Sequence, residues 1–197
     1  DSLDSDFTKL KADRIELIAE KGQIGEKDDP LEVDVREFAS ANKGYIVLKA
    51  QDLINVRETA GDMNVKEATA SAGDVILRAA DSILDDNNNQ AADVTGDSIT
   101  LTADSGPLGV KENWLEINTK SGSGTLTGQS FGHSYIKEVS GDLSLNRVGA
   151  EDTTKEINDS TVYLVSPGQI LNGRDDTGPN VVAGKVQLTA NGDIGKQ

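Results

Sequence analysis

An internal repeat constrains this chain more than any other feature of its sequence. Lys11–Val33 and Thr95–Ile117 align without a gap, with Ile15 on Ile99 and with glycines and apolar residues in register. A third copy begins at Ala183–Gly195, where Val186 falls on Ile99. Other segments repeat at similar offsets, namely Val56–Val65 with Ile136–Leu145 and Gly73–Leu84 with Ser160–Leu171. Such self-similarity is the sequence signature of an architecture built from stacked units.

Each repeat consists of short alternating runs separated by turn residues. In Arg14–Leu17, Ser98–Leu101 and Asp142–Leu145, apolar residues stand at every second position with polar residues between them. This alternation predicts strands with one buried face and one solvated face. Gly, Asn, Asp and Ser fill the turns, where they supply positive φ angles and local side-chain hydrogen bonds. No convincing helical period runs through the chain, so we predict an all-β fold.

The spacing of the strand starts predicts coils. The leading residues Ile15, Ile46, Val75 and Ile99 recur at intervals of 31, 29 and 24, which together make one repeat unit. We interpret this as three coils of roughly 28 residues per unit, each with two or three strands, and about seven coils in all. Stacked coils place like strands about 4.8 Å apart with parallel hydrogen bonding. The predicted units of this single solenoid cover about 1–81 and 82–168, with a partial unit over 169–197.

Composition favours a slim solenoid over a globular β fold. Hydrophobic residues make up 36% of the chain and aromatic residues only 4%. Ladders of Ile, Leu and Val fill a narrow core without many rings. A β-sandwich is the competing all-β fold, because it needs short strands at a similar spacing. A sandwich does not require the long-range sequence copies that place Ile15 on Ile99, so the solenoid is preferred.

The acidic charge and the absence of cysteine restrict the partners and the setting. A formal net charge of −15 points away from nucleic acid, whose phosphates demand Lys and Arg, and disfavours an anionic membrane surface. The chain contains no run of about 18 apolar residues, so no membrane-inserted segment is predicted. The chain has no Cys, which is compatible with a secreted protein that crosses membranes unfolded. It opens on Asp1 without a signal peptide, and we expect a piece of something longer.

Several phrases resemble the repeats of filamentous-haemagglutinin-type exoproteins and related giant bacterial adhesins. They are SITLTADSGPLG from Ser98, GDVILRAADSILD from Gly73, SGDLSLNRV from Ser140 and KVQLTANGDIG from Lys185. The resemblance covers nearly the whole chain. It implies a right-handed parallel β-helix, secretion to the bacterial cell surface or the medium, and a role as a stalk, adhesin or extracellular filament. No carbohydrate- or receptor-binding residue is carried over, because no site motif matches.

Acidic turns supply the candidate metal ligands. The run Asp85 to Asn89 follows a predicted strand, and its counterpart one repeat later contains two further aspartates. Ca²⁺ takes roughly six to eight oxygen ligands, which Asp and Asn side chains and turn carbonyls can supply. The EF-hand spacing is incomplete and the calcium β-roll nonapeptide is absent, and such turns are common for backbone reasons alone. Ca²⁺ binding and plain solvated turns therefore both stay open. The candidate ligands are Asp85, Asp86, Asn87, Asn89, Asp175 and Asp176.

Two further residues are candidates for a site. His133 is the single histidine, and the adjacent Ser134 raises the idea of a catalytic triad. With no second histidine and no nucleophile elbow, we expect His133 to be a half-exposed rung or loop residue. Trp114 is able to stack on a sugar ring, with Tyr135 or Phe131 beside it only if the coils bring them together. The alternative is that Trp114 folds over the side or the end of the solenoid.

The sequence as a whole predicts a non-enzymatic structural and adhesive module of a large secreted or cell-surface bacterial protein. Its expected partners are neighbouring coils of the parent chain, other copies of itself stacked end to end, and surface glycans. No cofactor is required, with Ca²⁺ as an option. The alternative is a β-helix carbohydrate-active enzyme or a tailspike-like polysaccharide-binding protein. Some carboxylate pair is inevitable among 34 acidic residues, but Lys and Arg are scattered without a focus, which speaks against a lyase site.

Overall fold

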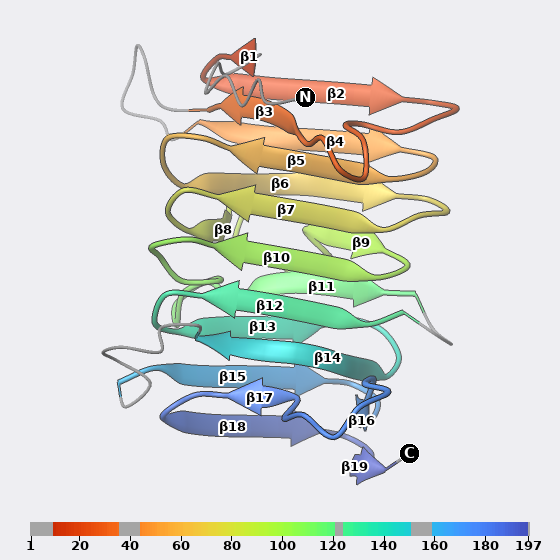
Figure 1. Ribbon diagram of the computed structural model, residues 1–197, viewed down its shortest axis with the longest axis vertical. Coiled ribbons are helices and arrows are strands. Elements are labelled where there is room, and N and C mark those ends of the chain that lie inside the picture. The colour runs from red at the N-terminus through yellow and green to blue at the C-terminus, as the bar shows by residue number, and fades with distance from the viewer. Residues whose placement is uncertain (1–9, 36–43, 121–123, 151–158, 197) are drawn as a thin grey trace.

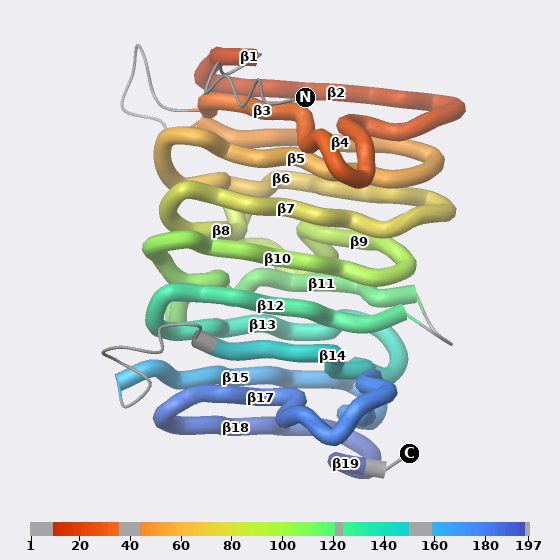
Figure 2. Tube along the Cα trace, viewed as in Figure 1, coloured from red at the N-terminus to blue at the C-terminus, as the bar shows by residue number. Residues whose placement is uncertain are grey.

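The structure consists of two parallel β-sheets, and in each sheet the strands stack as successive rungs. It is a computed structural model that describes residues 10–35, 44–120, 124–150 and 159–196. Strands of the two sheets alternate along the chain, except at two rungs that each consist of two short strands, so each coil contributes to both (Figure 1). The described residues contain no helix, and hence none that is long and apolar enough to cross a membrane. The predicted all-β parallel solenoid of about seven coils is confirmed, and Figure 2 follows its path.

We call the ten-stranded sheet sheet A and the nine-stranded sheet sheet B. The strands of sheet A are β1 (Leu10–Lys11), β3 (Leu31–Asp34), β5 (Ile54–Glu58), β7 (Val75–Ala79), β10 (Ile99–Ala103), β12 (Leu126–Ser130), β14 (Leu143–Ala150), β16 (Ile170–Asn172), β17 (Val181–Val182) and β19 (Ile194–Lys196). The strands of sheet B are β2 (Arg14–Ala19), β4 (Tyr45–Ala50), β6 (Met63–Ala70), β8 (Ile83–Asp85), β9 (Val94–Gly96), β11 (Leu115–Thr119), β13 (Ser134–Glu138), β15 (Thr161–Ser166) and β18 (Lys185–Ala190).

Apolar side chains form ladders between the two sheets. In sheet A, Val56, Leu77 and Leu101 pair rung to rung and are each 0% exposed. In sheet B, Leu48 pairs with Ala68, and both are likewise fully buried. The strands alternate as the sequence predicts: β10 reads buried, half-buried, buried, half-buried, buried. The core is therefore a narrow column of aliphatic residues, which a chain poor in aromatic residues can fill.

Two glycines allow the corners of the coils to pack tightly. Gly25 and Gly109, which the internal repeat aligns, have φ angles of 73° and 66°. A Cβ atom at Gly25 would lie 2.1 Å from the carbonyl oxygen of Asn55, and one at Gly109 would lie 2.4 Å from that of Tyr135. Both positions therefore need glycine for its positive φ and for the close approach of the next coil.

The repeat unit spans three and a half coils, not the three that the spacing predicts. Ile15 lies in β2 of sheet B, whereas its copy Ile99 lies in β10 of sheet A. The coils are also shorter than predicted, because Val75 and Ile99, the most closely spaced of the leading residues, lie in adjacent rungs and pair directly. Alternation marks a buried face but does not say which sheet a strand joins, so the residues used to count coils mixed the two sheets. Each repeat thus places its motifs on the sheet opposite to the previous copy.

The ladders generate a first prediction. Replacing the fully buried Leu101 with Ala removes one member of a continuous ladder and leaves a cavity, so we expect a loss of about 2–5 kcal/mol of unfolding free energy. Ile18, which is 59% exposed, is the matched control, and Ile18→Ala should change stability by less than about 0.5 kcal/mol. Urea denaturation monitored by circular dichroism measures both. Equal midpoints for the two variants would contradict the ladder.

Candidate functional site

A break in sheet B marks the candidate site. β8 pairs with the first half of β6 and β9 with the second half, so these two short strands together fill one rung. The intervening chain, residues 86–93, leaves the rung and returns, and we call it the β8–β9 loop. Asp85 is the last residue of β8, and Asp93 directly precedes β9. The next rung is β11, which pairs with β9 and carries Glu116.

The break brings three carboxylates together. Asp85, Asp93 and Glu116 each offer an oxygen atom, and these oxygens all lie within 4.8 Å of one another. The side chains are buried, with exposed fractions of 7%, 1% and 2%. In the part of the chain that the structure describes, no other three acidic or histidine side chains approach so closely. We call these three residues the carboxylate cluster.

Backbone N–H groups of neighbouring residues bind two members of the cluster, whereas one oxygen of the third has no partner. Asp85 accepts hydrogen bonds from the N–H groups of Asn87 and Asn88 at 2.7 and 2.8 Å. Asp93 accepts the N–H of Glu116 at 3.0 Å. Oε1 of Glu116 lies 3.9 Å from Nζ of Lys137. Its Oε2 is the single buried side-chain oxygen or nitrogen in the described residues that has no hydrogen-bond partner.

Other buried carboxylates of this fold have partners. Glu138, which is 0% exposed, accepts hydrogen bonds from the N–H and the hydroxyl of Thr119 at 3.1 and 2.8 Å. Asp34, which is 2% exposed, forms an ion pair with Lys11 at 3.2 Å. A buried carboxylate oxygen without a partner carries the full cost of its lost hydration. Oε2 of Glu116 is therefore the exception among these buried carboxylate oxygens.

Burial raises the pKa values of these carboxyl groups. Loss of hydration, followed by the charge of Asp85, raises the pKa of Asp93 from its ordinary 3.8 to about 8. Burial also raises the pKa of Glu116, against the opposing effect of Lys137. Burial likewise raises the pKa of Glu138 to about 7. With no cation present, Asp93 therefore holds a proton at neutral pH.

A surface hollow of about 260 Å³ lies beside the cluster, on the outer side of sheet B. Its lining includes Asn88, Gln90, Glu112, Trp114, Glu116 and Lys137. Lys137 donates a hydrogen bond to the side chain of Gln90. Trp114 packs edge-on against Tyr135, with 5.7 Å between ring centroids, and Tyr135 stacks on Tyr163 at 4.7 Å. The hollow therefore combines one aromatic side chain, Trp114, with several hydrogen-bonding groups. We call Trp114 with the two tyrosines that support it the aromatic wall.

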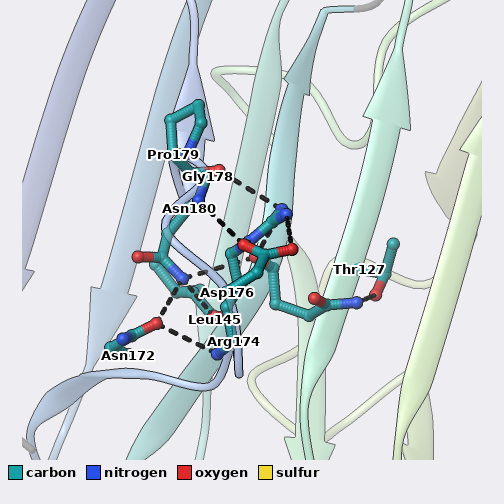
Figure 3. Close-up of polar contacts among 9 residues, drawn as sticks. Thr127, Leu145, Asn172, Arg174, Asp176, Gly178, Pro179 and Asn180 are labelled. Carbon is teal, nitrogen blue, oxygen red and sulfur yellow. Dashed lines mark hydrogen bonds and ion pairs between the residues drawn. The ribbon is translucent and has the colours of Figure 1, made fainter.

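One repeat later, a second loop has the same build. β16 and β17 both pair with β14, as β8 and β9 both pair with β6. We call residues 173–180 the β16–β17 loop. The repeat that places Gly73–Leu84 on Ser160–Leu171 also aligns Asp85 with Asn172 and Asp93 with Asn180. In Figure 3, Nδ2 of Asn180 donates to Oδ1 of Asn172 at 2.9 Å and to the carbonyl of Leu145 at 2.6 Å. In the second loop, two amide side chains thus bond directly to each other. The equivalent positions of the first loop hold two carboxyl groups.

The predicted calcium ligands of the first loop fall into two groups. Asp85 belongs to the carboxylate cluster. Asp86, Asn87 and Asn89 lie in the β8–β9 loop outside it, where Asn87 Oδ1 accepts the N–H of Asn89 at 3.1 Å and Asn89 Oδ1 accepts that of Ala91 at 2.6 Å. These contacts shape the loop. Ca²⁺ binding by Asp86, Asn87 and Asn89 stays a prediction.

The predicted ligands of the second loop lie apart from the cluster. Asp175 is exposed in the β16–β17 loop. Asp176 accepts two hydrogen bonds from the guanidinium of Arg174, at 2.7 and 2.6 Å (Figure 3), and these lower its pKa to about 2. The carboxylate of Asp176 is thus already paired with a cation. Ca²⁺ binding at Asp175 and Asp176 also stays a prediction.

The coils bring together Trp114 and Tyr135, while Phe131 stays 46% exposed on its turn. His133 is exposed, and its Nδ1 accepts the N–H of Thr161 at 3.2 Å. Ser134 is fully buried and shares a hydrogen bond with another serine hydroxyl. The placement of His133 agrees with the expected loop residue.

Sequence reasoning missed Asp93 and Glu116. Glu116 stands in a strand, where a carboxylate reads as solvated, and only the break between β8 and β9 places it near Asp85. A signal was nevertheless present in the repeat. In the alignment of the two loops, the two flanking positions are both Asp in one copy and both Asn in the other, at Asn172 and Asn180.

The raised pKa of Asp93 predicts a pH dependence of stability in metal-free buffer. The folded state retains a proton that the unfolded chain has lost between pH 3.8 and about 8, so stability should fall as pH rises through this window. The raised pKa of Glu138 contributes to this loss of stability only up to about pH 7. Asp93→Asn should therefore flatten the remaining decline between pH 7 and 8 and stabilise the protein at pH 8 by at least about 1 kcal/mol. Urea midpoints in EDTA test this; an unchanged slope in the variant would refute it.

Comparison with known proteins adds no relative: no family model, no curated protein and no solved structure matches this chain.

Proposed function

We propose that the protein is a non-catalytic structural and adhesive module, a rod of stacked coils whose outer face binds a saccharide. The observation that carries this proposal is the hollow beside Trp114, where one aromatic ring stands among several hydrogen-bonding side chains. Saccharide sites combine these two elements, because sugar rings have apolar faces that pack on aromatic rings and hydroxyls that need polar partners.

The aromatic wall is held in place by its neighbours. Nε1 of Trp114 donates to the carbonyl of Lys111 at 3.1 Å, which fixes the indole against the chain. Tyr135 and Tyr163 stack with an interplanar angle of 10°, so their faces cover each other. Trp114 meets this stack at 66° and itself lines the hollow. The wall is thus preorganised, which lowers the entropic cost of binding.

Charge narrows the class of saccharide. The hollow contains Glu112 and Glu116 against the single cation of Lys137, and the whole chain carries −15. A polyuronate would be repelled by this field. Asn88 and Gln90 offer amide groups that both donate and accept hydrogen bonds, which suits neutral hydroxyls. The proposed ligand is therefore a neutral oligosaccharide.

The setting that we propose is the cell surface or the extracellular medium of a bacterium. A net charge of −15 keeps a long rod soluble. The resemblance of the repeats to filamentous-haemagglutinin-type exoproteins supports the same setting, and the absence of Cys is compatible with it. A rod of parallel rungs would then hold the saccharide-binding face away from the surface that carries it.

A carbohydrate-active enzyme is the weaker alternative. A glycosidase needs two carboxyl groups that contact the scissile bond. The three clustered carboxylates are 7%, 1% and 2% exposed, and both Asp85 and Asp93 accept hydrogen bonds from the chain itself. This burial favours a structural role. Product formation in a screen of polysaccharide substrates would restore the enzymatic alternative.

Removing the indole tests the proposed function. A glycan array identifies a neutral oligosaccharide, and titration calorimetry then compares variants. Trp114→Ala should weaken binding at least about fivefold, since stacking on an aromatic ring contributes on the order of 1 kcal/mol or more. Phe131→Ala removes an exposed ring outside the hollow and should leave affinity unchanged. Retention of no glycan by the wild type, or equal affinity in the two variants, would contradict the proposal.

A second candidate function is end-to-end assembly, and the last rungs favour it. Val186 in β18 is 44% exposed, although its rung neighbour Val162 is 0% exposed. Ile194 in β19 is 51% exposed, against 2% for its neighbour Ile170. These side chains continue the core ladders to the edge of the described strands. We propose that, in a solution of this chain, strands of a second copy pair with this edge and cover these side chains.

Sedimentation velocity tests this assembly. The wild type should associate as its concentration rises, and Val186→Lys should reduce the association, because it places a charge in the core ladder. Gln187→Lys is the matched control: it adds the same charge at the neighbouring position, which pairs with the outward-facing Tyr163, and should associate like the wild type. A wild type that stays monomeric at all concentrations would rule out assembly through this edge.

A further inference from the structure

We propose that Asp85, Asp93 and Glu116 bind a divalent cation, with Ca²⁺ as the expected ion, and that this ion closes the break between β8 and β9. The inference does not rest on saccharide binding, because the ligands are buried carboxylates and not the aromatic wall. Two observations carry it: the convergence of the three carboxylates, and the buried oxygen of Glu116 that has no partner.

The geometry fits a single ion. Ca²⁺–oxygen distances are about 2.3–2.6 Å, so two oxygens bound to one ion lie at most about 5 Å apart. The oxygens of the cluster lie within 4.8 Å of one another. Lys137 approaches only Oε1 of Glu116, which leaves Oε2 for the ion. Small adjustments of the side chains would therefore let one ion contact all three residues, without a change of fold.

The all-oxygen donor set selects the ion. The cluster holds carboxylates without His, and the chain has no Cys, so the nitrogen and sulfur ligands that favour Zn²⁺ are missing. Mg²⁺ demands a near-ideal octahedron and keeps most of its water, which a buried cluster covered by a loop disfavours. Ca²⁺ accepts irregular coordination by several carboxylates. Three negative charges also suit a divalent ion, since they exceed its charge only by one.

The second copy of the loop shows what the first one lacks. Nδ2 of Asn180 donates to Oδ1 of Asn172 and to the carbonyls of Leu145 and Asn146, at 2.9, 2.6 and 3.3 Å. A hydrogen-bond donor thus sits among three oxygens (Figure 3). In the first copy this position holds Asp93, whose carboxyl lies beside that of Asp85 and carries no amide donor.

The backbone around the two copies is the same. Asn87 donates its N–H to Asp85, as Arg174 does to Asn172. The carbonyl of Asp93 accepts the N–H of Ala68, as that of Asn180 accepts the N–H of Val148, both at 2.7 Å. The copies therefore differ in side-chain chemistry within one geometry. In the second loop, the partly positive N–H groups of the Asn180 amide face the surrounding oxygens. In the first loop, a cation would take that role.

A metal ion here would fasten the β8–β9 loop to the next rung. Asp85 and Asp93 stand at the two ends of the loop, and Glu116 belongs to β11. The ion would replace the continuous strand that the break interrupts in this rung. Asn88 and Gln90 of this loop line the hollow, so the ion would also hold one wall of the hollow in place.

Terbium luminescence provides the first test. Tb³⁺ replaces Ca²⁺ at oxygen sites, and Trp114 is the single tryptophan and lines the same hollow as Glu116. Excitation of Trp114 in the metal-free protein should give sensitised Tb³⁺ emission that saturates at one ion per chain and that Ca²⁺ displaces. No saccharide is present in this measurement. A lack of Tb³⁺ binding would therefore count against the cation site alone, and a lack of glycan binding would count against the proposed function alone.

Matched variants assign the ligands. Glu116→Gln and Asp93→Asn should each lower the apparent affinity at least about tenfold. The second of these introduces the residue that the repeat already carries at Asn180, and circular dichroism confirms that both fold. Glu112→Gln alters the hollow outside the cluster, and Asp175→Asn alters the other loop. Both should bind like the wild type.

Thermal unfolding gives an independent measurement. The melting temperature of the wild type should rise with Ca²⁺ concentration, because an ion bound only to the folded state stabilises it. The melting temperature of Glu116→Gln should not respond over the same range. An absence of displaceable Tb³⁺ emission would overturn the proposal and leave a cluster that shares protons only. Affinity that survives both cluster variants, or that is lost in Glu112→Gln or Asp175→Asn, would overturn it as well.

Discussion

The parallel pairing of each rung with the next is the interaction on which the rest of the structure depends. A coil of a solenoid has no core of its own, so its inward-facing aliphatic residues are buried only when the coils before and after it stay in register. Leu77, for example, pairs with Val56 on one side and with Leu101 on the other, and all three are fully buried. Slippage by one residue would turn such a ladder outward. Register is therefore fixed locally, at every rung.

The candidate site arises where this pairing is interrupted. β8 and β9 share one partner strand, and the loop between them lies outside the rung. That arrangement covers Glu116, which points away from the aliphatic column, and buries it to 2% exposure. The carboxylates thus converge because the rung is broken and not because a metal-binding motif encodes them. The same break supplies Asn88 and Gln90 to the hollow, so the cluster and the hollow share a single structural origin.

Duplication gives the chain two forms of one loop. Because the repeat is three and a half coils long, successive copies lie on opposite sheets. The acidic form of the loop therefore lies on sheet B, and the amide form, with Asn172 and Asn180, lies on sheet A. Because the backbone contacts agree, the loop was compatible with both side-chain sets. The amide form satisfies itself through a direct hydrogen bond. In the acidic form two carboxyls stand at these positions, and they repel each other once both are ionised. A fold that keeps such a cost at one of two equivalent positions indicates a use for the charge.

The sequence alone determined the fold class, because period-two alternation and a long internal repeat admit few architectures other than a parallel solenoid. It also named Asp85 as a candidate ligand and aligned the two loops. It did not determine which sheet each strand joins, since alternation is the same in both, and so it miscounted the coils per unit. Only the tertiary structure decided that Asp93 and Glu116 meet Asp85, because that contact depends on which rung follows the broken one. Burial then decided their chemistry, since the same three carboxylates in water would be ordinary solvated groups.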